Sequence, residues 1–341
     1  MTEVSIIGVD LAKNVFQLHG ARADGAVAFR KKVNRAQFLS FLAQQPRCLV
    51  AMEACATAHS WGRQIAELGH KVKLIAPIYV KPFVKRQKND VADAEAIVEA
   101  ASRPTMRFVA VKSEAHQARA MLFRTRQMLV GQRTQVINAL RGHLAEFGVV
   151  APKGRVHLKA LADTVACNEV DMPEMVRELA CQYLEQIVTL DTHIAKIEEK
   201  TRTVSRSSKT LKRLQTAPGV GPVTALAIEA FAPAMTDFKC GRDFSAWVGL
   251  VPRQHSTGGK SRLGRTSKMG QRDIRKLLII GAMAVVRAAV RHSTPKDPWL
   301  AKMLERKPRM LVAIALANKM ARTIWAMLTK EEDYRNPTVA A

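Results

Sequence analysis

The sequence predicts an α/β domain followed by mainly helical regions. The first hundred residues alternate short apolar runs with helical patterns, whereas residues 113–147 and 174–203 show the apolar period of long helices. A chain of 341 residues is also too long for one hydrophobic core. We therefore predict an α/β domain over 1–105, a helical hairpin over 106–207, a mostly helical domain over 208–330 and a flexible tail over 331–341.

The α/β region is expected to have the element order β-β-β-α-β-α-β-α. Its first three extended runs are separated by Lys, Gly and Asp turns and indicate a meander, while CLVAMEAC and KVKLIAP are typical of buried strands. Asn34 is a candidate cap for a helix that runs to Gln44, and a second helix is expected from Ser60 to Leu68. The predicted strands are 4–10, 14–21, 26–33, 48–55 and 71–77.

The two long helical segments are predicted to pair as a hairpin or coiled coil. In the second segment an apolar residue recurs every three or four positions from Val176 to Ile197, which is the pattern of a helix seam. The stretch 149–171 between them is poorly periodic and is predicted to be a connector. Four arginines of the first helix are either solvated or follow a phosphate backbone: Arg119, Arg124, Arg126 and Arg133.

The third region places a glycine-rich, basic loop between helices. Upstream of this loop, Pro218 to Pro222 (PGVGP) resembles a helix-hairpin-helix turn. The backbone amides of Gly219 and Gly221 are therefore candidate contacts to a DNA phosphate. The alternative is a compact turn that only packs two helices together.

The charge balance points to a polyanionic partner. Lys and Arg number 54 against 29 Asp and Glu, which gives a formal net charge of +25. Such a field attracts phosphate, so nucleic acid is the expected partner, and a merely basic or ribosome-associated protein is the alternative.

The cysteine spacing and the apolar runs predict a cytoplasmic protein. The five cysteines are scattered and lack paired CxxC spacing, which disfavours a disulfide framework and a zinc site and fits a reducing cytoplasm. The N-terminus opens directly on a strand-like run, so no secretion signal is expected. The longest apolar stretch, 310–328, carries Asn318, Lys319 and Arg322 and is predicted to be a core helix rather than a membrane span.

Four carboxylates are expected to converge at one edge of the α/β sheet. Asp10 ends the first strand and Glu53 lies near the end of the fourth, while Asp90 and Asp93 are spaced by three at a helix start. Converging carboxylates repel one another unless a hard cation neutralises them, and Mg²⁺ prefers such oxygen ligands. A magnesium site is therefore predicted. The alternative for the helical pair is that Asp90 caps the helix and Asp93 occupies its favourable first turn.

A serine lies among cations in the loop of the third region. Ser256 is a candidate nucleophile because neighbouring Arg and Lys would neutralise a phosphate, and the alternative is a phosphate-binding loop in which the hydroxyl only donates a hydrogen bond. Ser261 and Ser267 are alternative nucleophiles, and His255 is given no role. The cations expected to contact nucleic acid are Arg253, Lys260, Arg262, Arg265 and Lys268.

Longer motifs carry a family resemblance over nearly the whole chain. The strings IIGVDLAKNVFQLHG, VAMEACATAHSW and KNDVADAEAI, followed by GLVPRQHSTGGKSRLGRTSKMG, resemble the DEDD-type insertion-sequence transposases. The N-terminal domain of that family is like the Holliday-junction resolvase RuvC, with a ribonuclease H-like fold. Thr57, where a small glycine is expected, and Ile274 are small departures that touch no candidate site residue.

The resemblance implies the chemistry. The four acids of the family fall on Asp10, Glu53, Asp90 and Asp93, and its catalytic serine falls on Ser256. It also implies an enzyme that cuts and rejoins donor and target DNA, guided by a structured bridge RNA that the element encodes, and working as a homo-oligomer. Two rivals are a metal-dependent junction nuclease with an inert serine and a non-enzymatic DNA-binding protein.

Overall fold

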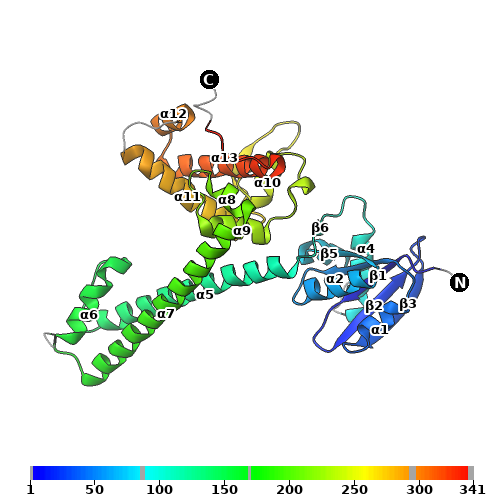
Figure 1. Ribbon diagram of the computed structural model, residues 1–341, viewed down its shortest axis with the longest axis horizontal. Helices are drawn as coiled ribbons and strands as arrows, with labels where there is room; N and C mark the ends of the chain where they lie inside the picture. The colour runs from blue at the N-terminus through cyan, green and yellow to red at the C-terminus, as the bar shows by residue number, and fades with distance from the viewer. Residues whose placement is uncertain (1–2, 85–88, 168–169, 292–296, 337–341) are drawn as a thin grey trace. The chain divides into compact units, whose positions relative to one another are not determined.

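The structure is a computed structural model in which residues 3–84, 89–167, 170–291 and 297–336 are described. The chain divides into two compact units, Met1–Gln117 and Ala118–Ala341 (Figure 1). The second unit contains both most of the long helices and the serine region.

The first unit is built on a six-stranded mixed sheet. The strand order is β3-β2-β1-β4-β5-β6, in which β1 pairs parallel with β4, and β4 pairs parallel with β5. The other neighbours are antiparallel. This mixed α/β order is compatible with a ribonuclease H-like fold, and it adds a short sixth strand to the five predicted. The strands are β1 (Ile6–Asp10), β2 (Val15–Ala21), β3 (Val27–Asn34), β4 (Leu49–Glu53), β5 (Lys71–Ile75) and β6 (Phe108–Val109).

Helices cover both faces of this sheet because its central strands are apolar on both sides. Ile7 and Val9 of β1 pack in a core with α1 and α2, whereas Ile6 packs on the opposite face with α4. Successive side chains of β1 point to opposite faces of the sheet and therefore pack into two separate cores. The helices of this unit are α1 (Phe38–Ala43), α2 (Ala58–Glu67), α3 (Pro77–Val80) and α4 (Asp90–Ala101), with a 3₁₀ turn η1 (Lys81–Phe83).

The start of the first helix was predicted wrongly. Asn34 does not cap α1 but ends β3, and its side-chain Oδ1 accepts a hydrogen bond from the Gln37 amide at 2.9 Å. This Asx-type turn uses the same side-chain chemistry as a helix cap, so the residue type alone does not separate the two. The helix begins only at Phe38, whose ring is fully buried.

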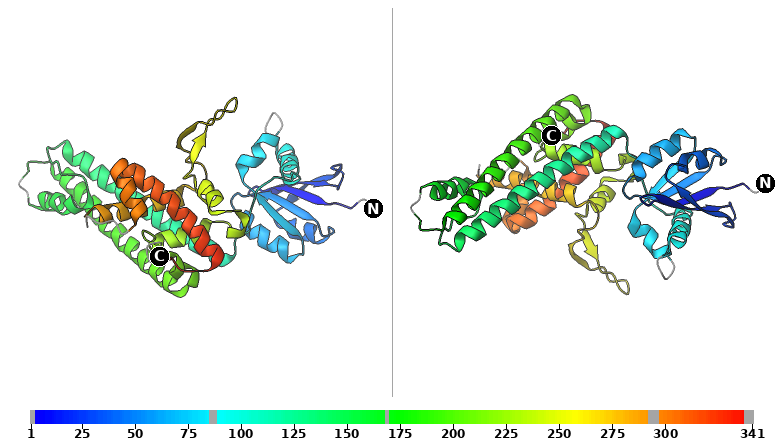
Figure 2. Two further views of the ribbon diagram at one scale, coloured as in Figure 1. Left: turned by 90° about the horizontal axis from the view of Figure 1, so that it is seen from above. Right: turned by 90° about the horizontal axis from the view of Figure 1, so that it is seen from below.

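Two long helices open the second part of the chain, as predicted. α5 (Glu114–Ala145) and α7 (Glu174–Ser207) lie side by side in Figures 1 and 2. Ile187, Leu190 and Ile194 of the predicted seam are buried, whereas Leu179 is 47% exposed. The connector between them is not irregular throughout, because it contains η2 (Arg155–His157) and α6 (Leu158–Ala166), which packs Leu161 into a core with α5 and α7.

The arginines on α5 pair with acids of the same unit. Each guanidinium lies within salt-bridge distance of a carboxylate. The sequence analysis considered only solvated arginines or arginines that contact a phosphate backbone, and did not predict these ion pairs. Sequence spacing does not show these partners because they lie far away along the chain. The pairs are Arg119–Glu229, Arg124–Asp273, Arg126–Glu198 and Arg133–Asp191.

The rest of the second unit is a helical body with one protruding hairpin. Its core is centred on α11 and α13, and the apolar stretch of α13 is packed into it: Val312, Ala317 and Ile324 are fully buried. α13 is long and apolar enough to cross a membrane by composition, but here it is a core helix. The elements are α8 (Lys209–Gln215), α9 (Pro222–Phe231), η3 (Met235–Asp237), α10 (Gly241–Val248), β7 (Pro252–Gln254), β8 (Leu263–Thr266), α11 (Arg272–Arg291), α12 (Pro298–Arg306) and α13 (Arg309–Lys330).

The PGVGP turn joins α8 to α9 and packs against α11. Gly219 has φ of +80°, and a Cβ added there would lie 2.8 Å from the Gly281 carbonyl oxygen. Helix packing is therefore enough to explain Gly219. Gly221 is exposed, precedes the first residue of α9 and has open space around it, so its amide stays a proposed DNA contact.

The first residues of the tail are tied to this body. The Tyr334 amide donates to the Thr216 Oγ1 at 2.9 Å, and the Tyr334 side chain packs against the core. The predicted flexible segment therefore has an anchored beginning, and residues 337–341 lie outside the described part of the chain.

Candidate active site

The sheet places two of the four predicted acids side by side. β1 and β4 are parallel neighbours, with Val9 paired to Met52, so Asp10 and Glu53 follow at the carboxyl ends of both strands. The three residues before each acid are buried, while both acids are half-buried at the rim. This edge of an α/β sheet is where side chains from neighbouring strands converge on a ligand.

The other two acids come from the first turn of α4. Asn89 has extended backbone angles, and its side chain accepts a hydrogen bond from the Val91 amide at 3.1 Å, so it starts the helix at Asp90. The cap is therefore Asn89, and capping does not account for Asp90. Asp90 and Asp93 do lie in the first turn, where a negative charge favours the helix dipole.

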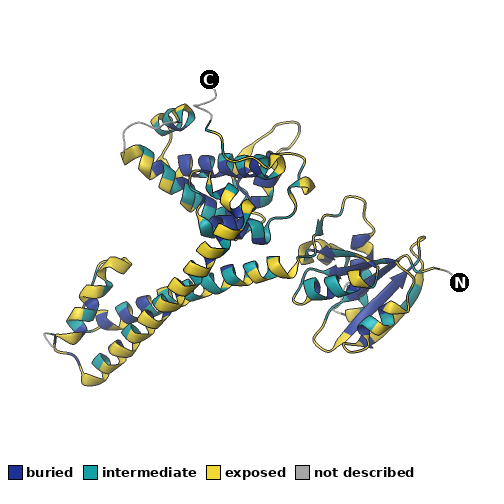
Figure 3. Cartoon of the chain, viewed as in Figure 1, coloured by how far each residue is buried: buried dark blue, intermediate teal, exposed yellow. Residues whose placement is uncertain are grey.

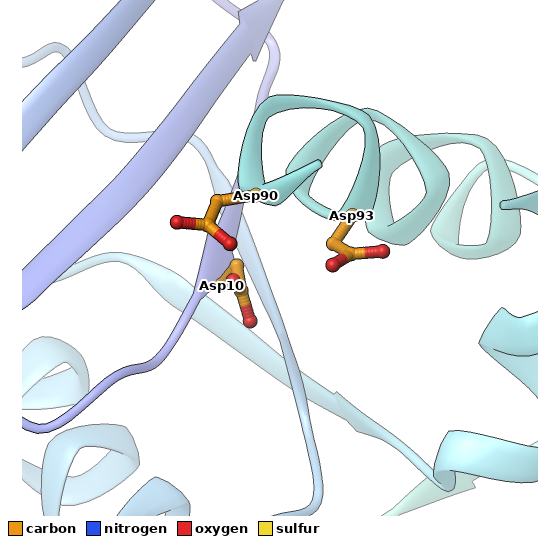
Figure 4. A group of neighbouring side chains, drawn as sticks. All are labelled: Asp10, Asp90 and Asp93. Atoms are coloured by element: carbon orange, nitrogen blue, oxygen red, sulfur yellow. The ribbon is translucent and has the colours of Figure 1, made fainter. Parts of the chain in front are cut away.

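Three of the acids meet. Asp10, Asp90 and Asp93 each offer one carboxylate oxygen, and these oxygens all lie within 4.8 Å of one another. Figure 4 shows Asp10 at the end of its strand, facing the helix turn that carries the two other side chains. Residues separated by eighty positions in the sequence thus form one acidic cluster, as the strand and helix positions predicted.

Glu53 is electrostatically coupled to this cluster although it lies outside the group of three. Burial raises the pKa of its carboxyl, and the negative charges of Asp10 and Asp93 raise that pKa further. A carboxyl whose neighbours resist its ionisation gains from a nearby cation. The four predicted acids therefore belong to one electrostatic site.

A glycine in β1 sets the distance between the strand and the helix. A Cβ added to Gly8 would lie 2.5 Å from the Ala94 carbonyl oxygen and 2.6 Å from a methyl group of Val98. Only a residue without a side chain allows α4 to pack this closely on β1. Gly8 thereby helps to bring Asp93 to Asp10, a role that sequence reasoning missed.

The loop after Glu53 has a backbone conformation at position 57 that favours glycine. Thr57 has φ of +72°, a left-handed conformation that suits glycine and is rare for a β-branched side chain. The small residue expected from the resemblance would adopt it without strain. Thr57 lies immediately before the first residue of α2.

Ser256 lies on a β-hairpin, where a glycine-rich loop was predicted. β7 and β8 pair antiparallel, the His255 amide donates to the Arg262 carbonyl oxygen at 2.8 Å, and Thr257 bridges to Lys260 beyond them. Gly258 and Gly259 have positive φ values and make the turn. The hairpin, yellow in Figure 2, projects from the helices of its unit.

The three serines of this segment differ in their surroundings. Ser256 and Ser261 are exposed near the hairpin tip, whereas the Ser267 Oγ is buried at its base. Figure 3 shows the buried residues of this unit gathered in its helices. The His255 ring lies against Gly264 of the opposite strand, since a Cβ there would be 2.9 Å from the ring Nε2. Exposure therefore favours a serine near the tip over Ser267.

The hairpin and its base form a strongly cationic surface. The sequence contains no Asp or Glu between Gly249 and Arg272. All five cations predicted to contact nucleic acid are exposed on this segment: Arg253, Lys260, Arg262, Arg265 and Lys268. An exposed hydroxyl on such a ribbon is accessible to a polyanionic strand.

One arginine that sequence reasoning missed holds the base of the hairpin. Arg275 of α11 donates from the same nitrogen to the Val248 carbonyl oxygen at 2.8 Å and to the Met269 carbonyl oxygen at 2.9 Å. Burial is the main cause that lowers the pKa of its guanidinium. In the sequence Arg275 resembles the many solvated cations around it, so no local signal identifies this role.

Comparisons with known proteins cover both regions. A family model described as transposase matches residues 7–148, and the model of the transposase IS116/IS110/IS902 family matches residues 211–297. A probable family 20 transposase of Pseudomonas aeruginosa is 48% identical over 97% of this chain and 99% of its own length.

Two further relatives are named for insertion sequences. The transposase for insertion sequence element IS1328 of Yersinia enterocolitica is 41% identical over 97% of this chain and 98% of its own length. The transposase for IS1111A of Coxiella burnetii is 41% identical over 98% of this chain and 92% of its own length. Similarity at this level over whole chains shows a common family: this chain belongs to the IS116/IS110/IS902 family of insertion-sequence transposases, enzymes that cut and rejoin DNA.

Proposed function

We propose that this transposase exchanges DNA strands with two sets of groups, the carboxylates Asp10, Glu53, Asp90 and Asp93 and the hydroxyl of Ser256. The observation that carries the proposal is the convergence of three carboxylate oxygens within 4.8 Å from a strand end and a helix start. An acidic cluster repels DNA, so a protein that only bound DNA would gain nothing from it. The enzyme assignment removes the non-enzymatic rival.

The acidic cluster fits Mg²⁺. Its donors are all carboxylate oxygens, the set that hard divalent cations prefer. Burial is the main cause of the raised pKa of Glu53, and the charges of Asp10 and Asp93, which a cation would offset, raise that pKa further. Asp10, Asp90 and Asp93 would hold the ion, with Glu53 beside them. A magnesium ion bound there supplies positive charge next to a phosphate and a Lewis acid for its oxygens.

Ser256 is the proposed nucleophile. Its Oγ would form a bond to a DNA phosphorus while the bond from that phosphorus to a deoxyribose oxygen breaks. The serine proton is lost to the surroundings and the leaving oxygen gains one, so one phosphoester replaces another without hydrolysis. The reverse step, with a different deoxyribose hydroxyl, rejoins DNA and frees the serine. The exposed cations of the hairpin would hold the phosphate for both steps.

We also propose that a guide RNA directs the transposase to its DNA sites. A basic protein that reads phosphate backbones needs another source of base identity, and pairing by an RNA encoded beside the reading frame would supply it. We expect purified protein, Mg²⁺ and donor and target DNA to recombine only when RNA transcribed from the noncoding flank of the element is added. A scrambled RNA of equal length is the control. Equal recombination with either RNA would refute guidance by pairing.

We further propose a homo-oligomer, since exchange between two duplexes requires several strand cuts. The long helices carry exposed apolar side chains that suit a partner helix: Met128 of α5 is 55% exposed and Val188 of α7 is 65% exposed.

Replacing Val188 by Glu is expected to convert a dimer or tetramer into monomers, because it places a charge on the apolar contact. Light scattering after gel filtration measures this change. Gln182→Glu adds the same charge at another exposed position of α7 and should leave the assembly intact. A wild-type monomer at near-physiological salt, with or without nucleic acid, contradicts the proposal.

A further inference from the structure

A cleft lies where the base of the hairpin meets α13. It has a volume of about 1010 Å³ and is lined by Gly264 to Thr266 and Lys268 on one side and by residues of α13 on the other. The side-chain amide of Asn318 donates to the Leu250 carbonyl oxygen at 3.1 Å and so ties α13 to the chain that enters the hairpin. The cleft therefore begins on the same hairpin that carries Ser256.

The described residues that line this cleft carry positive charge only. Among them are four cations and no acid: Arg265, Lys268, Lys319 and Arg322. Lys319 is already paired, since its Nζ lies 2.8 Å from the Asp297 Oδ2 and 4.6 Å from the centre of the Trp299 ring. The other three form no salt bridge within the described part of the chain, which leaves their charge available to a ligand.

Part of the lining of the cleft is apolar. Leu311, Ile314 and Ala315 of α13 line it together with Trp299, and Leu311 is 48% exposed. Cations beside an exposed apolar surface match a polynucleotide strand whose bases are unpaired, because the phosphates meet the charges and the faces of the bases meet apolar side chains. A fully paired duplex hides those base faces.

The backbone at Lys268 supports a ligand-binding role for its side chain. Lys268 has φ of +55°, in a segment where Gly249 and Gly270 also have positive φ. At both glycines an added Cβ would lie within 2 Å of a backbone oxygen, whereas Lys268 carries a full side chain that lines the cleft. Glycine suits this conformation better than lysine, so the fold alone does not require lysine here.

We propose that this cleft binds unpaired nucleotides of the DNA strand next to the phosphate attacked by Ser256. The proposal rests on the proposed function of Ser256 for the identity of the strand. It assigns Arg322, Trp299 and the apolar face of α13 to substrate binding, in addition to the cations of the hairpin. An unpaired strand would leave the hairpin and continue along α13.

Binding of fluorescent DNA to the full-length protein tests the proposal. One probe is a blunt duplex, and the other is the same duplex with a short unpaired extension. We expect the wild-type protein to bind the extended probe about tenfold more tightly, the gain from roughly one stacked base. Arg322→Glu and Lys268→Gly should abolish that gain. Lys268→Gly should also leave the thermal stability unchanged or higher, because glycine relieves the left-handed backbone.

The control is Arg306→Glu, which makes the same charge change at an exposed residue of α12 outside the cleft. It should weaken binding of both probes equally and keep the gain. An absent gain in the wild-type protein, a gain that survives both cleft variants, or a larger gain with a ribonucleotide extension would overturn the proposal. Ser256→Ala should keep the tighter binding of the extended probe. The binding measurement therefore tests the cleft separately from the proposed role of Ser256 as nucleophile.

Discussion

Replacing Asp10 by Asn is expected to reduce strand exchange at least ~1,000-fold while the protein still folds. The change removes one charged ligand from the acidic cluster, and loss of about 4 kcal/mol of transition-state stabilisation corresponds to this factor. Asp93→Asn should act in the same way. Strand exchange is measured with linear donor and target DNA by the yield of recombinant product at saturating Mg²⁺.

A second measurement separates metal binding from catalysis. Without Mg²⁺, Asp10→Asn should be as stable as the wild-type protein or more so at neutral pH, because it removes a negative charge that raises the pKa of Glu53. A carboxyl with a raised folded-state pKa destabilises the fold when it is ionised, and this destabilisation disappears as pH falls through that pKa. Added Mg²⁺ should raise the melting temperature of the wild-type protein and leave that of the variant unchanged.

The matched control is Asp24→Asn, in the turn between β2 and β3. The Asp24 Oδ1 accepts from the Ala26 amide at 2.9 Å, an interaction that asparagine can also make. This variant should retain both strand exchange and the thermal response to Mg²⁺. Wild-type recombination by the Asp10→Asn protein would refute the metal assignment, and an equal thermal response in both proteins would place Mg²⁺ elsewhere.

The acidic cluster was predictable because its positions follow from local patterns. Apolar runs with Asp10 at the end of one and Glu53 near the end of another indicate strands that carry a polar residue there, and Asp90 and Asp93 are spaced by three at a helix start. Parallel pairing of the two strands then brings their ends together. The contribution of Gly8 was not predictable, because a glycine within a strand does not reveal which helix packs against it.

The form of the serine region was not predictable for a similar reason. Its polar, glycine-rich composition is typical of a loop, and β7 and β8 are short, exposed strands without an apolar face to reveal their period. The α5 arginines show the same limit, since Glu229 and Asp273 lie over one hundred positions away in the sequence. Where tertiary contacts decide a role, local spacing does not identify it.

Ser256→Ala is expected to abolish the covalent link between protein and DNA, because the bond to phosphorus forms at the Ser256 Oγ. Binding of DNA and RNA should remain almost normal, since one hydroxyl contributes little to an interface dominated by phosphate contacts. The reaction is trapped on a nicked DNA substrate, and mass spectrometry of the DNA-linked peptide identifies the attached residue.

Ser261→Ala and Ser267→Ala are the matched controls, because both serines lie in the same cationic segment. The buried Oγ of Ser267 makes it the poorer nucleophile, whereas Ser261 is exposed, like Ser256, and is the stricter control. Both variants should form the adduct at Ser256. An adduct mapped to Ser261 would identify Ser261, and not Ser256, as the nucleophile. Transesterification conserves the phosphoester that rejoining requires, and it leaves the DNA attached to the protein. Cleavage without any adduct would therefore assign the reaction to hydrolysis at the acidic cluster and make the protein a metal-dependent nuclease.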